Sequence, residues 1–210
     1  RKPISIKGHL QALETSRPDR MILLDVRAEQ SLACLDYAVH DHLYASAVLV
    51  PFLKKELEGR DDFVVAAPDS GGVLRADKYA RLLSPQADLV YLSKRRSAPG
   101  IVGDVKDKIV IIVDDMIDSA GTIIAEAEVL MDAQAKEVWA IATHPLLSNN
   151  AAKRIEESAL ARVCVTDSIA QNKAKIKRIT NKIKFVTNAG LLASAIHRTH
   201  EGQSLSELIP

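Results

Sequence analysis

The sequence has little of what marks several large classes of proteins. It has only two cysteines in 210 residues, Cys34 and Cys164, and they lack the paired spacing of a zinc site or a disulfide framework. It has almost no excess charge, because 28 basic residues face 27 acidic ones and leave a net charge of +1. That balance argues against a dedicated nucleic-acid surface or a strongly acidic partner.

Long apolar runs are also missing. No uninterrupted apolar segment has the length that spans a bilayer, and no apolar core of a signal peptide follows Arg1-Lys2-Pro3. We therefore expect a soluble, cytoplasmic protein that has no membrane or nucleic-acid partner.

An initial methionine is absent as well, and a helical pattern starts at once. We expect that upstream residues were removed or left out, and that residues 1–210 form a single domain with a lead-in helix at about 1–18. With 47% apolar residues, a chain of this length can bury a full core.

Strand-like apolar runs alternate with helix-like segments along most of the chain. This alternation predicts an α/β fold with a mostly parallel sheet and helices on both faces. The predicted strands are 21–26, 63–67, 88–92, 108–113, 137–143 and 161–165.

The richest segment runs from Ile109 to Thr122. Its apolar strand leads into Asp114 and Asp115, and a turn with small residues then opens a predicted helix. Amide N–H groups at a helix N-terminus have no partner within the helix, and the helix dipole is positive there, so the turn can hold a phosphate. The two carboxylates can accept ribose hydroxyls or hold a hydrated divalent cation. The segment therefore predicts a site for a phosphorylated sugar.

Charged or glycine-rich segments follow other predicted strands. Asp69 lies in a Pro-Asp-Ser-Gly-Gly turn, and Lys94-Arg95-Arg96 form a basic loop. Asp25 lies near the end of the first strand, and Arg27 follows that strand. Ligands of open parallel sheets bind beyond the carboxyl ends of the strands, so these groups are expected to converge. Together they favour phosphoryl chemistry with a divalent metal.

These segments resemble, in order, those of the ribose-phosphate diphosphokinases, also called phosphoribosyl pyrophosphate synthetases. The chain is similar to the C-terminal half of that family plus a short lead-in, so we expect that an upstream ATP-binding half is missing here. The resemblance implies a phosphoribosyltransferase-like fold. The segments that carry it are 1–5, 43–45, 68–72, 94–96, 103–107, 113–122, 143–144 and 198–204.

The resemblance also implies an activity and its residues. The family transfers the diphosphoryl group of ATP to ribose 5-phosphate, uses Mg²⁺ and forms oligomers, which implies a homo-oligomer here. Lys94 and Arg96 correspond to its catalytic loop cations. The implied substrate-binding residues are Asp69, Asp114, Asp115, Asp118, Ser119, Ala120, Gly121 and Thr122.

Implied metal ligands are Asp25, Asp36, Asp41 and Asp69. The chain departs from the family at Arg27, which stands where the resemblance places a histidine. A guanidinium stays protonated and cannot ligate a metal, although it can contact a phosphate.

Two other functions remain open. The first is a catalytically weak regulatory paralogue that binds a sugar phosphate or nucleotide and assembles with active subunits, which Arg27 and a short basic loop favour. The second is a type I phosphoribosyltransferase, although no segment identifies the base-recognition hood that it needs.

Overall fold

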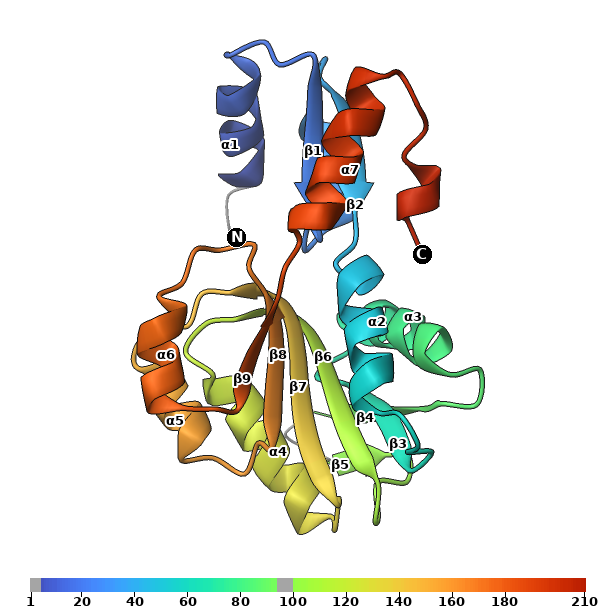
Figure 1. Ribbon diagram of the computed structural model, residues 1–210, viewed down its shortest axis with the longest axis vertical. Helices are drawn as coiled ribbons and strands as arrows, with labels where there is room; N and C mark the ends of the chain where they lie inside the picture. The colour runs from blue at the N-terminus through green and yellow to red at the C-terminus, as the bar shows by residue number, and fades with distance from the viewer. Residues whose placement is uncertain (1–4, 94–99) are drawn as a thin grey trace.

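The computed structural model describes residues 5–93 and 100–210, and its main body is a seven-stranded sheet (Figure 1). The strand order is β5-β4-β3-β6-β7-β8-β9, and every neighbouring pair is parallel except β4 with β5. The predicted α/β class with a mostly parallel sheet is confirmed. The strands are β3 Phe63–Ala67, β4 Asp88–Ser93, β5 Gly100–Val102, β6 Ile109–Ile117, β7 Glu137–Pro145, β8 Arg162–Thr166 and β9 Ile183–Val186.

Helices cover both faces of this sheet, because its central strands are apolar on both sides. Alternate residues of β6 enter two separate cores: Val110 and Ile112 pack on one face, and Ile109 and Ile111 pack on the other. The first core includes side chains of α4, α5 and α6, and the second includes those of α2 and α3. These helices are α2 Ser46–Glu56, α3 Val73–Leu83, α4 Gly121–Asp132, α5 Ala151–Glu156 and α6 Lys173–Ile179.

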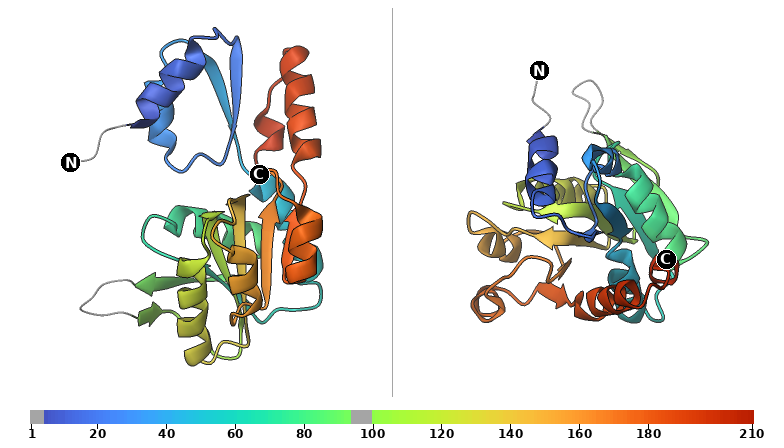
Figure 2. Two further views of the ribbon diagram at one scale, coloured as in Figure 1. Left: turned by 90° about the vertical axis from the view of Figure 1, so that its left-hand side faces the viewer. Right: turned by 90° about the horizontal axis from the view of Figure 1, so that it is seen from above.

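A smaller unit, here called the terminal lobe, is built from both ends of the chain. It contains a two-stranded parallel sheet of β1 and β2, and it lies against the carboxyl ends of the main strands (Figures 1 and 2). Leu43, Leu191 and Leu205 form part of its core. Its elements are α1 Ser5–Glu14, β1 Arg20–Leu24, η1 Glu29–Cys34, β2 Val39–Leu43, α7 Ala189–His200 and η2 Ser206–Leu208.

Helix α1, Ser5–Glu14, lies within the segment of about residues 1–18 for which a lead-in helix is expected. The assignment of residues 1–210 to a single domain remains a prediction. In the part of the chain that the structure describes, no helix combines the length and the apolar character that crossing a membrane requires.

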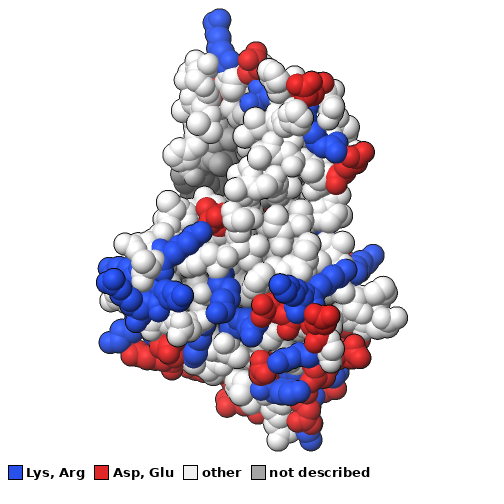
Figure 3. Space-filling view, viewed as in Figure 1, with Lys and Arg blue, Asp and Glu red and all other residues white. Residues whose placement is uncertain are grey.

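The surface mixes charges of both signs, in keeping with the small net charge. Basic side chains gather on one side of the main body, over α6 and the adjoining β9 (Figure 3). The basic residues of these two elements are Lys173, Lys175, Lys177, Arg178 and Lys184.

A buried carboxylate holds the terminal lobe together. Glu14, at the end of α1, is 2% exposed and accepts hydrogen bonds from the amides of Asp36, Tyr37 and Ala38 at 2.8–3.1 Å. The bonds from these amides, that of Asp36 above all, lower the pKa of Glu14 below its ordinary value.

We expect Glu14→Gln to remove an acid-sensitive part of the stability. A lowered carboxyl pKa stabilises the folded state above the pKa of the unfolded chain, and this contribution is lost as the pH falls through the folded-state pKa. Thermal melts at pH 3–7 should show the variant several degrees less stable at pH 7, with the gap closing towards pH 3. The exposed Glu58→Gln is the matched control. A gap that stays constant with pH would contradict this account.

Candidate functional site

Strand β6 carries two acidic residues of the predicted site on its backbone. The strand does not end with its apolar run at Val113 but pairs with β7 as far as Ile117 and Pro145. Asp114 and Asp115 therefore lie within a hydrogen-bonded ladder, which fixes their backbone before any ligand binds.

The turn after β6 presents amide N–H groups. Ala120 has a left-handed backbone, with φ of 61°, and α4 starts at Gly121. The amide of Ile124 donates to the carbonyl of Ala120 at 3.1 Å, which is the first hydrogen bond of the helix. The N–H groups of residues 121–123 precede it and point out of the helix N-terminus, an arrangement that suits a phosphate.

Helix α5 and the loop before it hold this turn in place. Arg154 donates from Nη1 to the carbonyl of Ser119 at 2.7 Å, and the hydroxyl of Ser148 donates to Oδ1 of Asp118. A Cβ at Gly121 would lie 3.3 Å from Nη2 of Arg154, so the arginine packs closely against the helix start. These contacts fix the turn and place a positive charge beside it.

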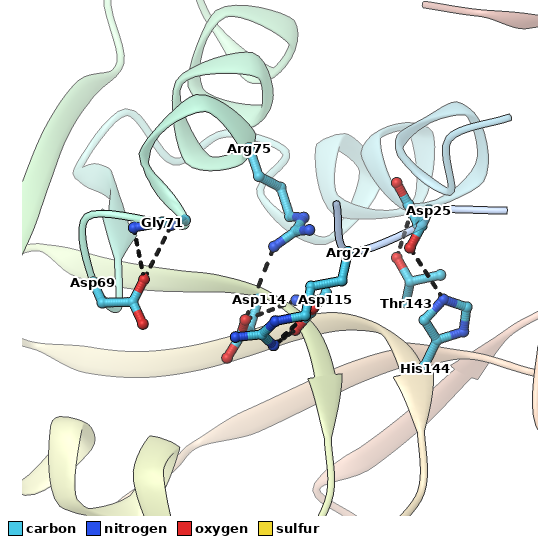
Figure 4. A network of polar contacts seen from close by, with 10 residues as sticks. Asp25, Arg27, Asp69, Gly71, Arg75, Asp114, Asp115, Thr143 and His144 are labelled. Atoms are coloured by element: carbon cyan, nitrogen blue, oxygen red, sulfur yellow. Dashed lines mark hydrogen bonds and ion pairs between the residues drawn. The ribbon is translucent and has the colours of Figure 1, made fainter. Parts of the chain in front are cut away.

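A second turn, after β3, carries Asp69. Oδ1 of Asp69 accepts from the amides of Gly71 and Gly72 at 2.9 and 3.1 Å. A Cβ at Gly71 would come within 3.2 Å of that oxygen, so glycine allows this tight approach. The turn leaves the other carboxylate oxygen pointing away from these amides (Figure 4).

These segments surround one pocket of about 520 Å³. It lies at the carboxyl ends of β3 and β6, where ligands of open parallel sheets bind. The structure therefore brings together all eight residues predicted to bind substrate. They are Asp69, Asp114, Asp115, Asp118, Ser119, Ala120, Gly121 and Thr122.

Two guanidinium groups stand over the acidic pair (Figure 4). Nη1 of Arg27, from the loop after β1, lies 3.1 and 2.9 Å from the two carboxylate oxygens of Asp115. The Asp115 side chain is only 2% exposed, whereas that of Arg27 is 70% exposed. Arg75, on α3, lies 3.9 Å from Oδ1 of Asp114. Each carboxylate thus has an arginine as its neighbour.

Asp114 has a raised carboxyl pKa. Burial raises its pKa to about 6, and the neighbouring Asp115 adds to the rise, whereas the amide of Asp115 opposes it by donating to Oδ1 of Asp114 at 2.8 Å. The side chain is ionised at pH 7 and loses its charge in mild acid.

Asp25, a predicted metal ligand, ties the terminal lobe to the main sheet. It is buried, and its Oδ2 accepts from the amide of Ala45 at 2.9 Å and from the hydroxyl of Thr143 at 2.5 Å. His144 approaches the backbone carbonyl of Asp25 at 3.4 Å. This anchoring places Arg27, two residues further on, over the pocket (Figure 4).

Asp36 and Asp41 do not join the pocket. Asp36 accepts from Nε2 of Gln11 at 3.3 Å, and Asp41 pairs with Arg20 at 3.2 Å, both within the terminal lobe. Over residues 5–93 and 100–210, no three His, Cys, Asp or Glu side chains gather closely enough to hold a metal ion. The four predicted metal ligands therefore do not gather at one place in this part of the chain, and Asp25, Asp36 and Asp41 each contact other groups.

Lys94 and Arg96, the predicted catalytic cations, lie outside the described residues. Two cations that the sequence interpretation missed lie at the site instead, Arg75 and Arg154. Arg75 follows the Gly71-Gly72 turn by three residues, a spacing that puts it on the first turn of α3. Arg154 had no local signal, since only the packing of α5 brings it to the turn after β6.

Comparison with known proteins places the chain in a family. The model of the phosphoribosyl synthetase-associated domain matches residues 62–210, which include β3, β6, α4 and both turns of the site. The chain belongs to this family. The resemblance noted in the sequence is thereby confirmed, and this phosphoribosyl synthetase-associated domain contains every pocket residue named above except Arg27.

Relatives of this phosphoribosyl synthetase-associated protein carry names that agree with the family. Ribose-phosphate pyrophosphokinase of Staphylococcus saprophyticus is 40% identical over 215 residues, and ribose-phosphate pyrophosphokinase 1 of Listeria monocytogenes is 42% identical over 214. Each alignment covers 99% of this chain and 65% of the relative. The chain thus spans slightly less than two thirds of the length of these relatives.

A solved structure supports the fold. The crystal structure of phosphoribosylpyrophosphate synthetase from Mycobacterium smegmatis superimposes with a TM-score of 0.88 at 33% identity, and it covers 96% of this chain and 65% of its own. The phosphoribosyltransferase-like fold expected from the resemblance is confirmed by this match.

Proposed function

We propose that the pocket binds ribose 5-phosphate, and that the chain supplies the sugar-phosphate site of a ribose-phosphate diphosphokinase. One observation carries the proposal: a helix N-terminus suited to a phosphate and carboxylates suited to ribose hydroxyls face a single pocket. The relatives named ribose-phosphate pyrophosphokinase support it, as they are about 40% identical over 99% of this chain.

Each group of residues has its own task in this proposal. The N–H groups of residues 121–123, with the hydroxyls of Ser119 and Thr122, hold the 5-phosphate. Asp114 and Asp118 accept hydrogen bonds from ribose hydroxyls and so orient the sugar. Arg154 keeps the turn rigid, which reduces the entropy lost on binding.

The reaction that follows is diphosphoryl transfer. The anomeric hydroxyl oxygen attacks the β-phosphorus of ATP, the bond between that phosphorus and the oxygen bridging it to the α-phosphate breaks, and AMP leaves with the bridging oxygen. The hydroxyl proton is released, and the product is the 1-diphosphate of ribose 5-phosphate. In this proposal Lys94 and Arg96 stabilise the charge on the transferring phosphates, as positioned cations do in other phosphoryl transfers.

Magnesium fits part of this pocket. Mg²⁺ commonly binds through one or two carboxylates and completes its shell with water and substrate phosphates. Asp69 provides one carboxylate oxygen that the neighbouring glycine amides leave available, so it would hold the ion that accompanies ATP. The bound ion would neutralise charge on the phosphates. We do not assign this role to Asp25, Asp36 or Asp41, because the side chains of these residues contact other groups.

We also propose that the protein is located in the cytoplasm. Cys34 and Cys164 are free thiols, which suits the reducing cytoplasm. We include a homo-oligomer on the basis of the resemblance.

A regulatory subunit is the second candidate function. It would bind the sugar phosphate without forming product and would assemble with active subunits. The ion pair between Arg27 and Asp115 favours it, because a residue that cannot ligate a metal stands where the resemblance places a histidine.

Formation of AMP separates the two candidates. The chain is incubated with ATP and Mg²⁺, with and without ribose 5-phosphate, and AMP is measured by ion-exchange chromatography. AMP that depends on the sugar phosphate would support the diphosphokinase. Binding of ribose 5-phosphate without AMP would favour the regulatory subunit, and absence of both would contradict the proposed site.

We expect the affinity for ribose 5-phosphate to weaken in mild acid because of Asp114. Its raised pKa of about 6 means that the carboxylate needed for the ribose hydroxyls is lost below that pH. Calorimetric titrations at pH 5–8 without metal should show a dissociation constant that rises by up to about tenfold per pH unit below 6. This rise comes in addition to the effect of protonation of the ligand's phosphate group.

Asp114→Asn provides the comparison. The phosphate group of the ligand also titrates near pH 6, so the variant reports that contribution alone. The wild-type profile should be steeper than that of the variant. Profiles of equal steepness would show that Asp114 does not receive the sugar in its ionised form.

A further inference from the structure

Among the described residues, Arg27 is the residue of the terminal lobe that forms an ion pair with the acidic pair Asp114 and Asp115 of the pocket. It lies beyond β1, and its guanidinium meets Asp115, 88 positions later in the chain. The backbone before it is fixed, because Asp25 is bound to Ala45 and Thr143. The Arg27 side chain therefore extends from a fixed segment of backbone to a buried carboxylate.

Asp115 needs a counter-charge. A carboxylate that is 2% exposed has lost most of its contact with water, and burial of an unpaired charge is costly. In acidic pockets that bind phosphorylated ligands, a divalent cation often provides that charge. Here a guanidinium that stays protonated at any ordinary pH provides it.

A metal ion on Asp115 would conflict with this arrangement. The ion would have to displace Arg27 from both carboxylate oxygens, or lie beside it against the repulsion of like charges. The adjacent Asp114 has Arg75 as a neighbour at 3.9 Å, which adds a second positive charge. The donor set around the acidic pair therefore suits fixed cations and does not suit a divalent ion.

We infer that Arg27 takes the place of a divalent cation in the sugar-phosphate pocket, so that ribose 5-phosphate binds without metal. This inference rests on the proposed function, and it adds that the nucleotide and the sugar phosphate are bound with different cations. Magnesium at Asp69 belongs to the nucleotide, whereas the sugar phosphate is received by a site whose charge is already balanced by arginine.

Calorimetry of the wild-type chain with ribose 5-phosphate, in EDTA and in 5 mM Mg²⁺, tests this directly. We expect the two dissociation constants to agree within about twofold. In Arg27→His the carboxylate loses its permanent counter-charge, and a neutral imidazole can coordinate a metal. Mg²⁺ should then strengthen binding by about tenfold, a typical coupling between two ligands.

The control is Arg81→His, the same exchange at an arginine of α3 whose side chain is 79% exposed and pairs with Asp77. It should behave as the wild type, and it accounts for any association of Mg²⁺ with the ligand itself. Thermal melts confirm that both variants fold. The wild-type comparison stands even if Arg27→His does not fold.

The outcomes are distinct. Equal wild-type affinities with a metal-dependent Arg27→His support the inference. Wild-type binding that requires Mg²⁺, or an Arg27→His that stays independent of it, overturns the inference and leaves the proposed function intact. Absence of wild-type binding under both conditions overturns both.

Discussion

Gly121→Asp is expected to abolish measurable binding of ribose 5-phosphate at concentrations that saturate the wild type. The change places a carboxylate at the first residue of α4, where the amides of the turn face the pocket. It would repel the phosphate and would lie against Arg154, whose Nη2 is 3.3 Å from the position of the new Cβ. We expect a loss of at least about 100-fold, or roughly 2.7 kcal/mol of binding free energy.

Folding should survive this change. An acidic residue in the first turn of a helix interacts favourably with the helix dipole, and the arginine side chain that it meets is flexible. Gly190→Asp is the matched control, since it places the same charge in the first turn of α7, where a new Cβ meets nothing within 4 Å. Titration calorimetry measures binding and circular dichroism measures the fold. An affinity of Gly121→Asp equal to that of Gly190→Asp would exclude this turn as the phosphate site.

Trp139→Ala is expected to cause the largest loss of stability. Trp139 is completely buried in β7, its Nε1 donates to Glu137 at 2.8 Å, and the guanidinium of Arg162 lies 4.5 Å from the ring centre. Truncation leaves a large cavity in the core between the sheet and its helices, which costs about 3–5 kcal/mol. That is a large part of the total stability of a typical domain, roughly 5–15 kcal/mol.

Urea unfolding of wild type and variant measures this cost. The control is Ile196→Ala on α7, whose side chain is 62% exposed and whose loss should change the free energy of unfolding by about 0.5 kcal/mol or less. A Trp139→Ala as stable as the control would mean that the ring does not fill the core in solution.

Much of the main sheet could be predicted from side-chain patterns. The segment 63–67 was predicted as a strand and forms β3 with the same bounds, because its apolar run is buried and a turn ends it. Strand β6 was predicted to end at Val113, where the apolar run stops. It continues to Ile117 because its backbone pairs with β7, and a pattern of side-chain polarity cannot report that pairing.

Other strands had no such signal. The residues of β2, Val39–Leu43, include two histidines and an aspartate, and those of β9, Ile183–Val186, lie in a lysine-rich segment. Both are strands because a neighbouring strand, β1 or β8, provides the hydrogen bonds. The pairing with a neighbouring strand decides these structures, so the composition of the segment itself gives no indication of them.

The site divides in the same way. Residues directly after β3 and within or after β6 could be predicted, because topology takes strand ends to one edge. The family resemblance implies that Asp36 and Asp41 are metal ligands, but their side chains contact residues of the terminal lobe. Arg75 was missed although its spacing from Gly71-Gly72 places it on the first turn of α3. Arg154 could not be found, since only the packing of α5 brings it to the turn after β6.

Binding of ribose 5-phosphate to the wild-type chain is the measurement that tests the central claim most directly. Titration calorimetry at pH 7.5, above the pKa of Asp114, should give saturable binding at one site, and ribose without its phosphate should bind at least about tenfold more weakly. Saturation that is lost in Gly121→Asp and kept in Gly190→Asp would place the ligand at the start of α4. A folded wild-type chain that takes up no ribose 5-phosphate would contradict the account.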